Sequence, residues 1–446
     1  MQSVKQPTRS DSGRSDSNLA RTRGIEAARW VRVILFTAGY PYGPGEQFLE
    51  TEVPLLASAF PEVVIVPQDI AGKARCVPRN VIVSKALARV LSRRWPDALR
   101  AALELPLTRY FWREAISEQK VLRNAACLRR LISFYSDAIR TRRWLLAAHR
   151  REDIGPNDVL YTYWLSGVTL GAVLARQAIG GLHVVSRAHG VDLYQERSSP
   201  PYLPFRVRTL SGVDAVYAVS EHGASYLRQH WPTAHVCLSR LGVHDPRHDT
   251  RPSTDGVFRV VSCSFAVAIK RLVLLMKSLQ LFADRRRDVQ VLWTHIGDGP
   301  VLPALMAMAG HALSRNFQIR FTGGLANARV MEFYREHPVD VFVNVSASEG
   351  LPVSIMEAQS FGIPVVATAV GGIPEIVTDQ NGRLLAANPS PSEIADGLQE
   401  FVPGTASSWI KRQASKETWR ARCSAPDNYM AFINELAGCV RAGSCD

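Results

Sequence analysis

Short apolar runs that end in glycine-rich turns recur along this chain, and they restrict its fold more than any other feature. The run WVRVILFTA (30–38) leads into GYPYGPGEQFLETEVPLLA, where helical periodicity begins near Gln47, and VVIVP (63–67) follows. A strand, a glycine-rich turn, a helix and another strand form a βαβ unit, which builds a parallel sheet. Three more strands are predicted in this half of the chain, in the runs DVLYTYW (158–164), HVVSRAHG (183–190) and VDAVYAVS (213–220).

A second series of strand patterns begins after the polar stretch HDPRHDTRPSTDG (244–256), which we interpret as a linker because it has two prolines and no apolar period. It starts with VFRVVSCSF (257–265) and continues through VQVLWTHIGDG, FQIRFTGG, VDVFVNVS, IPVVATA and GRLLAAN. The sequence therefore predicts an α/β protein with one parallel sheet in residues 29–243 and another in 257–405. Ligands of open parallel sheets bind at the carboxyl ends of the strands, so we expect a central cleft between the two halves. The remaining segments are a disordered tail at 1–28, a basic helical insertion at 85–151 and a mostly helical segment at 406–446.

The composition is that of a globular protein of two or three domains, with 446 residues, 46% of them apolar and 21% charged. There is no run of about 18 apolar residues that would predict a membrane-spanning helix, and the first residues lack the apolar stretch of a secretory signal. The seven cysteines are scattered and show no C-x-x-C spacing, which argues against a disulfide framework or a zinc site. We therefore expect a cytoplasmic protein.

The net charge of +13 is concentrated in residues 85–151, which hold sixteen basic and five acidic residues. Basic residues with apolar anchors suit an anionic membrane surface, so we expect peripheral binding to the inner face of the plasma membrane. In the alternative interpretation the aromatic residues of this segment belong to the core, and the arginines form a solvated face. Nucleic acid is not expected as a partner, because no helix-turn-helix, zinc finger or RNP-type motif accompanies the charge. The aromatic residues are Trp95, Tyr110, Phe111, Trp112, Phe134, Tyr135 and Trp144.

The stretch SEGLPVSIME (348–357) places two carboxylates, a glycine and a proline at the carboxyl end of the predicted strand VDVFVNVS. Pro352 fits the first turn of a helix, so we expect Glu349 in the loop before that helix and Glu357 inside it. Free amides at a helix start bind anions, and a carboxylate accepts hydrogen bonds from vicinal hydroxyls. This combination suits a nucleotide sugar, although a glutamate near a helix start is often only a cap.

The segment AVGGIPEIV (369–377) repeats this arrangement after the next strand. Gly371 and Gly372 precede Pro374 and Glu375, which we expect to open a helix. Two glycine-lined helix starts on adjacent strands would converge on one place.

The stretch SASEGLPVSIMEAQSFGIPVVATAVGGIPEIV…NGRLL resembles the donor-site motif of retaining glycosyltransferase family four, with Glu349 and Glu357 as its E-x7-E pair. HIGDGP (295–300) and RAHGVDLY (187–194) extend the resemblance, and YPYGPGEQFLETEV and LYTYW are similar to the subgroup that makes bacterial exopolysaccharide and lipopolysaccharide of the colanic-acid type. The resemblance covers most of the chain outside 1–28 and 85–151. It implies a GT-B fold of two facing Rossmann-like domains. It also implies transfer of a sugar from a nucleoside diphosphate to a lipid-linked saccharide.

The resemblance also implies roles for single residues. Glu357 would hold the ribose hydroxyls, and Glu349 would contact the transferred sugar together with the amides of Gly350 to Val353. Lys270 would neutralise the diphosphate leaving group. His189 would hydrogen-bond the donor sugar while a neighbouring backbone carbonyl faces the developing oxocarbenium. The implied set comprises the catalytic residues His189, Glu349 and Lys270, the donor-binding residues Lys270, Arg271, Glu349, Gly350, Leu351, Pro352, Val353 and Glu357, and the phosphate and acceptor loop residues Gly43, Gly45, Glu46 and Asp192.

One position departs from the family pattern. An arginine usually stands five residues before the lysine as a second phosphate cation, and here that position is Phe265. Arg271 is the candidate replacement. We expect no metal and no cofactor, because the remaining histidines show no metal-ligand spacing.

Two other functions stay open on the sequence alone. One is a nucleotide-sugar epimerase on the same scaffold, and the other is a non-catalytic subunit that binds sugar nucleotides, which the phenylalanine at 265 would favour. A P-loop, a G-x-S-x-G elbow and a dinucleotide fingerprint after the first strand are all missing from the sequence.

Overall fold

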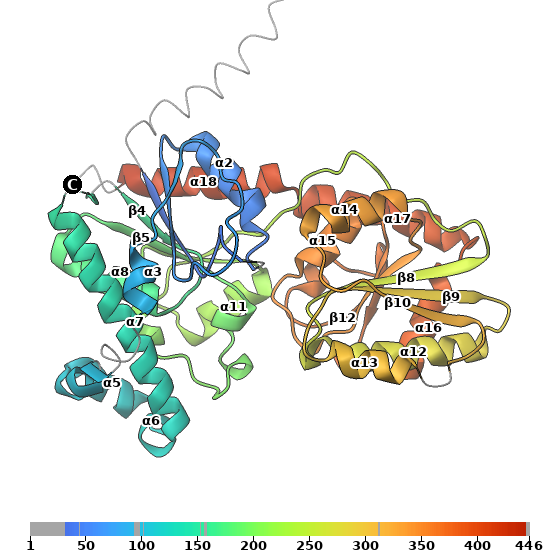
Figure 1. Ribbon diagram of the computed structural model, residues 1–446, viewed down its shortest axis with the longest axis horizontal. Coiled ribbons are helices and arrows are strands. Elements are labelled where there is room, and N and C mark those ends of the chain that lie inside the picture. Colours follow the sequence, from blue (N-terminus) through green and yellow to red (C-terminus); the bar gives the residue numbers. More distant parts are fainter. Residues whose placement is uncertain are drawn as a thin grey trace, which may run out of the picture.

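The protein consists of two α/β domains that lie side by side, as Figure 1 shows for the computed structural model. The structure describes residues 32–43, 45–92, 99–100, 102–151, 153–155, 158–310 and 313–442. The predicted tail at 1–28 and Trp95 of the basic insertion lie outside these residues.

The first domain is built on a parallel sheet of seven strands in the order β3-β2-β1-β4-β5-β6-β7. The five strands predicted from apolar runs are present, whereas β3 and β7 were not predicted because each has only three residues. The strands are β1 (Val33–Thr37), β2 (Val63–Pro67), β3 (Val81–Val83), β4 (Val159–Thr162), β5 (His183–Ala188), β6 (Ala215–Ala218) and β7 (Val236–Leu238).

The second domain has a parallel sheet of six strands in the order β10-β9-β8-β11-β12-β13. All six coincide with predicted strands; β11 and β12 are buried throughout, whereas β10 (FQIRF) alternates buried or partly buried residues with exposed ones. The strands are β8 (Val257–Cys263), β9 (Gln290–Ile296), β10 (Phe317–Phe321), β11 (Val341–Asn344), β12 (Val365–Thr368) and β13 (Gly382–Leu385).

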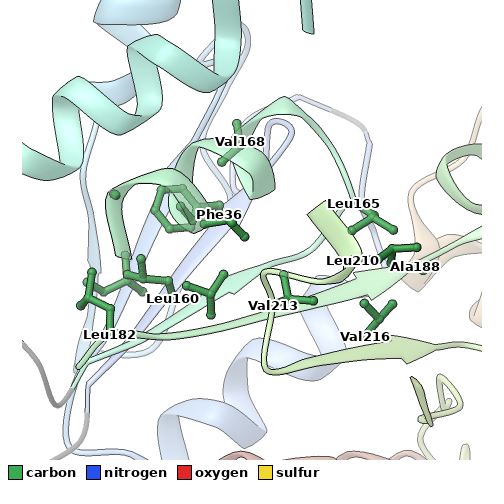
Figure 2. Close-up of a cluster of buried hydrophobic side chains, with 14 of the residues drawn as sticks. Phe36, Leu160, Leu165, Val168, Leu182, Ala188, Leu210, Val213 and Val216 are labelled. Carbon is green, nitrogen blue, oxygen red and sulfur yellow. The ribbon is translucent and has the colours of Figure 1, made fainter. Parts of the chain in front are cut away.

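Helices cover both faces of each sheet, as alternating strands and helices require. In the first domain, side chains of β1, β4, β5 and β6 pack against α8 and the loops around it (Figure 2), with Phe36, Leu160, Val168 and Val216 in the cluster. The helices outside the basic insertion are α2 (Leu49–Ala59), α8 (Gly167–Ile179), α9 (Gly190–Leu193), η3 (Gln195–Arg197), α10 (Arg206–Leu210), α11 (Glu221–His230), η4 (Ala268–Lys270), α12 (Leu272–Arg285), α13 (Leu302–Ala309), α14 (Asn327–Glu336), α15 (Val353–Ser360), η5 (Ile373–Glu375), α16 (Pro391–Leu398), η6 (Gln399–Phe401), α17 (Ala406–Arg422) and α18 (Ala425–Ala442).

The basic insertion is helical, and its parts differ in burial. The long helix α7 packs along α8. Among the described aromatic residues, Phe111 and Tyr135 are buried, and Tyr110, Phe134 and Trp144 pack against apolar clusters, as in the alternative interpretation, whereas Trp112 is exposed. The shorter helices α5 and α6 project at the lower left of Figure 1. The insertion contains α3 (Ala86–Ser92), η2 (Leu105–Leu107), α5 (Arg109–Ser117), α6 (Lys120–Arg123) and α7 (Ala125–Arg150).

The helical segment after the second sheet returns to the first domain. α17 packs against α15 of the second domain, whereas α18 packs against α2 and inserts Phe432, Ile433 and Leu436 into the apolar cluster of the first sheet. The chain therefore crosses between the domains twice. The two crossings are hydrogen-bonded to each other, since the amide of Val243 donates to Cys423 O and the amide of Ala425 donates to Val243 O.

A buried ion pair joins α18 to the centre of the first domain. Arg187 on β5 and Glu52 on α2 are fully buried, with 3.3 Å between Nη2 and Oε1. The hydroxyl of Tyr161 donates to the same carboxylate oxygen at 2.7 Å, and the guanidinium lies 4.3 Å from the ring centre of Phe432. Charges taken out of water need this compensation, because removing one partner leaves the other buried and unpaired.

We expect Glu52→Gln and Arg187→Met each to lower the free energy of unfolding by about 3–5 kcal/mol, because each leaves an uncompensated buried group. The double variant should lose less than the sum of the single losses. Urea denaturation measures both. Glu221→Gln, which breaks an exposed pair with Arg228, is the control and should cost about 0–1 kcal/mol. Additive losses in the double variant would contradict the pairing.

Candidate functional site

Lys270 and Glu349 meet at the carboxyl edge of the second sheet. Lys270 ends the short helix η4 after β8, and Glu349 lies in the loop after the neighbouring strand β11. The lysine Nζ lies 2.5 Å from Oε1 of Glu349, and the side-chain Nδ2 of Asn344 donates to the same oxygen at 3.3 Å. The carboxylate is nearly buried, while the ammonium keeps a partly exposed side. The ammonium has three N–H donors, so it can hold Glu349 and still bind an anion.

Glu357 lies inside α15, as predicted, and is largely buried. The side-chain amide of Asn327 donates to its Oε1 at 2.5 Å. Burial raises the pKa of Glu357 to about 7, and the hydrogen bond from Asn327 opposes this rise. A carboxyl group with this pKa changes its charge near neutral pH, so its capacity to accept hydrogen bonds depends on pH.

The start of α15 has the form that an anion site requires. Pro352 precedes the first helical residue Val353, and no side chain caps the helix. Leu351 is buried in the apolar cluster of the domain, which anchors the loop. Backbone amides at an uncapped helix start carry the positive end of the helix dipole.

The second glycine segment packs against the first, as predicted, but it does not open an α-helix. A Cβ built on Gly371 would lie 1.9 Å from Glu349 O, and the amide of Gly372 donates to Gly350 O at 2.7 Å. Residues 373–375 form only the single turn η5. The prediction that a helix opens here holds only for this one turn. The Glu375 carboxylate accepts hydrogen bonds from the first amides of α11 in the other domain, each at 3.0 Å.

Arg271 follows Lys270 directly, but its side chain binds the loop after β13. Its guanidinium donates to Ala387 O at 2.8 Å and to Asn388 Oδ1 at 2.6 Å. Arg271 has a positive φ of 51°, so its side chain leaves the backbone in a different direction from that of Lys270. Phe265 is 62% exposed. The structure therefore brings Lys270, but not Arg271, into contact with Glu349.

His189 lies at the carboxyl end of β5 in the first domain, within a cluster of aromatic rings. Its ring centre is 4.8 Å from that of Tyr163, 4.5 Å from that of Trp164 and 5.9 Å from that of Phe48. Both ring nitrogens are buried and have no hydrogen-bond partner. Burial and the nearby charge of Arg187 lower the pKa of His189 well below 6.5. The imidazole is therefore neutral, with one donor and one acceptor that no described group satisfies.

Asp192 holds the backbone around His189. Its Oδ1 accepts a hydrogen bond from the amide of His189 at 2.6 Å, and its Oδ2 accepts one from the amide of Leu165 at 2.7 Å. Burial raises the pKa of Asp192 to about 6, against the effect of these hydrogen bonds. The carboxylate is thus used to position the strand ends.

Glu46 lies in the predicted phosphate loop, and its carboxylate binds groups of the protein itself. Its carboxylate accepts hydrogen bonds from the amides of residues 38–40 at 2.7–2.9 Å and from Trp164 Nε1 at 2.6 Å. Gly43 has φ of 65° and Gly45 has open space around its Cα. Glu46 therefore shapes this loop and holds Trp164 against His189.

The carboxyl edges of the two sheets approach each other where Gly190 of the first domain contacts Gly350 of the second domain. A Cβ built on Gly350 would lie 3.1 Å from the amide nitrogen of Gly190. Because His189 precedes Gly190 and Glu349 precedes Gly350, the contact brings the predicted residues of the two domains together across the junction.

Sequence reasoning missed several partners in this site. Trp164 stands in the quoted LYTYW run, but nothing in the pattern showed that its indole would bind Glu46. Asn327 and Asn344 carry no motif at all. Trp164 and Asn327 bind partners far apart in the sequence, whereas Asn344 is only five residues from Glu349.

In the part of the chain that the structure describes, no group of three or more His, Cys, Asp or Glu side chains is arranged to hold a metal ion. None of the described helices is both long and apolar enough to cross a bilayer.

Residues 259–402 match the family model for glycosyl transferases group 1. The chain is 34% identical over 118 residues to sulfoquinovosyl transferase SQD2 of Arabidopsis thaliana, covering 26% of this chain and 21% of that protein. It is 24% identical over 244 residues to the putative colanic acid biosynthesis glycosyltransferase WcaL of Escherichia coli K12, covering 53% and 59%. The chain thus spans less than two thirds of the length of either relative.

Solved structures confirm the predicted GT-B fold of two Rossmann-like domains. Sucrose-phosphate synthase from Thermosynechococcus elongatus aligns with a TM-score of 0.64 and 15% identity, covering 92% of this chain and 99% of that one. Anabaena Alr3699/HepE in complex with UDP and glucose aligns with a TM-score of 0.62 and 15% identity, covering 91% and 99%.

We expect Glu46→Gln to lower the free energy of unfolding by about 2–3 kcal/mol, because an amide cannot accept from three backbone N–H groups and an indole together. Urea denaturation followed by tryptophan fluorescence measures the loss. The matched control is Glu50→Gln, which breaks only an exposed pair with Arg75 and should cost at most about 1 kcal/mol. Equal losses in both variants would show that the carboxylate of Glu46 does not organise the loop.

Proposed function

Because residues 259–402 form a glycosyl transferases group 1 domain on a GT-B fold, we propose that this protein is a retaining, metal-independent hexosyltransferase. Its donor is a nucleoside-diphosphate sugar, and its acceptor is a lipid-linked oligosaccharide of a bacterial surface polysaccharide. The observation that carries the proposal is the contact between Lys270 and Glu349 at the uncapped start of α15, with Glu357 on the same helix.

Each residue of the second domain has a chemistry that suits one part of the donor. Ionised Glu357 accepts hydrogen bonds from the ribose hydroxyls, and Glu349 accepts from hydroxyls of the sugar. The amides at the start of α15 and the ammonium of Lys270 stabilise the diphosphate as its negative charge develops. A fixed ammonium supplies this charge without a divalent metal.

The first domain supplies a neutral, apolar surface to the sugar. His189 offers one donor and one acceptor from within its aromatic cluster, which excludes water from the reacting carbon. Its low pKa keeps a second positive charge away from the developing oxocarbenium.

The acceptor is proposed from the names of relatives and from the basic insertion. WcaL is described as a colanic acid biosynthesis glycosyltransferase, and SQD2 as a sulfoquinovosyl transferase. The segment from Leu103 through η2, α5 and α6 exposes apolar side chains as well as arginines, including Arg109, Arg113 and Arg123. A membrane-bound acceptor would be reached from such a surface. The exposed apolar residues are Leu103, Leu107, Trp112, Ile116 and Leu122.

The test of the proposed function is turnover of UDP- and GDP-sugars by the purified protein. We expect Lys270→Ala and Glu357→Ala each to lower kcat/KM by about 10²–10³-fold, the usual cost of losing a charge-stabilising group. Lys277→Ala, an exposed lysine on α12, is the matched control and should leave turnover unchanged. Release of an altered free nucleotide sugar without an acceptor would indicate an epimerase. Donor binding without turnover would indicate a non-catalytic binding subunit.

The affinity for the donor should rise with pH between about 6 and 8, because only ionised Glu357 accepts from both ribose hydroxyls and its pKa is about 7. Below the pKa, each pH unit should weaken binding up to about tenfold. Calorimetry at several pH values measures this. Glu357→Gln should remove the dependence, and Asn327→Ala should move the midpoint to higher pH because its hydrogen bond favours the ionised form. A flat profile in the wild type would contradict the assignment.

We expect the protein to bind vesicles that contain anionic lipid, and this binding should weaken as salt rises, because exposed charges are screened over about 8–10 Å at 0.1–0.15 M. Leu107→Ser combined with Ile116→Ser should abolish sedimentation with the vesicles. Ile410→Ser, which changes an exposed isoleucine on α17, is the control. Vesicle binding that depends neither on the salt concentration nor on the substitutions at Leu107 and Ile116 would contradict the proposed surface.

A further inference from the structure

Arg197 lies in the first domain, next to the glycine that contacts the second domain. It ends the turn η3, which follows α9 at the carboxyl edge of the first sheet. A Cβ built on Gly190 would lie 1.9 Å from Arg197 Nη1 and 3.2 Å from the amide nitrogen of Gly350. The guanidinium and the loop before α15 therefore approach the same side of Gly190, and a side chain at position 190 would displace the arginine.

The guanidinium of Arg197 has an unused donor. Nη1 is buried and has no hydrogen-bond partner, and no carboxylate of the described residues forms an ion pair with this side chain. The neighbouring carboxylate of Glu196 accepts from Tyr226 instead. A buried donor without a partner costs about 1–3 kcal/mol, and more when it is charged, so this position favours a ligand with acceptor oxygens.

The second domain supplies little positive charge to an anionic ligand at the start of α15. Lys270 shares its charge with Glu349, and Arg271 is bonded to Ala387 and Asn388. Phe265 is exposed and apolar. A nucleoside diphosphate carries more than one negative charge, so one shared ammonium compensates it only in part.

We infer that Arg197 is the second cation of the donor site, and that its guanidinium hydrogen-bonds the diphosphate held by Lys270 and the start of α15. This inference rests on the proposed function. Guanidinium groups bind phosphate oxygens through two parallel N–H donors, and they do so more strongly than neutral donors. The cation comes from the first domain and the other contacts from the second, so a bound diphosphate holds the two domains together.

The test is calorimetry with the full-length protein, titrated with UDP and GDP and with the matching nucleosides. For the nucleotide that the wild type binds, Arg197→Gln should weaken the affinity for the diphosphate at least tenfold and leave the affinity for the nucleoside unchanged. Arg197→Lys should retain part of the affinity, because it keeps the charge but loses the planar pair of donors. Arg151→Gln, an exposed arginine before β4, is the matched control and should bind like the wild type.

A second variant separates a direct contact from a structural effect. Gly190→Ala should also weaken diphosphate binding, and its effect should be smaller in the Arg197→Gln background, since the methyl group displaces the guanidinium in addition to crowding the amide of Gly350. Thermal unfolding confirms that each variant is folded.

Three results would overturn the assignment of Arg197. The first is Arg197→Gln binding the diphosphate like the wild type while Lys270→Ala weakens it, which leaves the proposed function intact. The second is an equal loss for nucleoside and diphosphate, and the third is an unchanged effect of Gly190→Ala in the Arg197→Gln background. If the wild type binds neither diphosphate, the proposed function itself fails and the assignment fails with it.

Discussion

The buried pair of Arg187 and Glu52 is the interaction on which the first domain depends. It connects β5 with α2, receives the hydroxyl of Tyr161 on β4, and is covered by Phe432 of α18. Ions in an apolar interior are tolerated only in a fixed geometry, so the pair holds these elements in one arrangement. His189 follows two residues after Arg187, and the position of its ring is fixed by the same strand.

The site divides its chemistry between the two domains. The second domain presents the carboxylates of Glu349 and Glu357 with the ammonium of Lys270, whereas the first presents a neutral imidazole among aromatic rings. In the proposed function, hydroxyl groups and a diphosphate would contact the former surface, and the reacting carbon of the sugar would face the latter. The glycine contact at the junction allows the two backbones to approach as closely as this division requires.

Most of the fold could be predicted because buried parallel strands show continuous apolar runs. The three-residue strands β3 and β7 are too short for such a signal. The packing of α18 on the first domain could not be predicted either, since the pattern of an amphipathic helix does not show which of two domains its apolar face will cover.

The candidate site was predictable where a motif fixes the local backbone, as at Glu349, Gly350 and Glu357. The site was less predictable where the hydrogen-bond partners of a side chain come from other segments of the chain. Glu46 and Asp192 lie in the predicted segments, but their carboxylates accept hydrogen bonds from backbone amides. The direction of Arg271 depends on a positive φ that no residue type indicates.

The paired crossings between the domains restrict how one half can turn against the other. The backbone at Val243 forms a parallel bridge with the backbone at 423–425. Neither segment can extend or slide without breaking these hydrogen bonds. Any change in the angle between the halves must bend both crossings at one place. This bridge favours a rotation of the halves about it, and a straight separation is resisted by the apolar face of α18 on the first sheet.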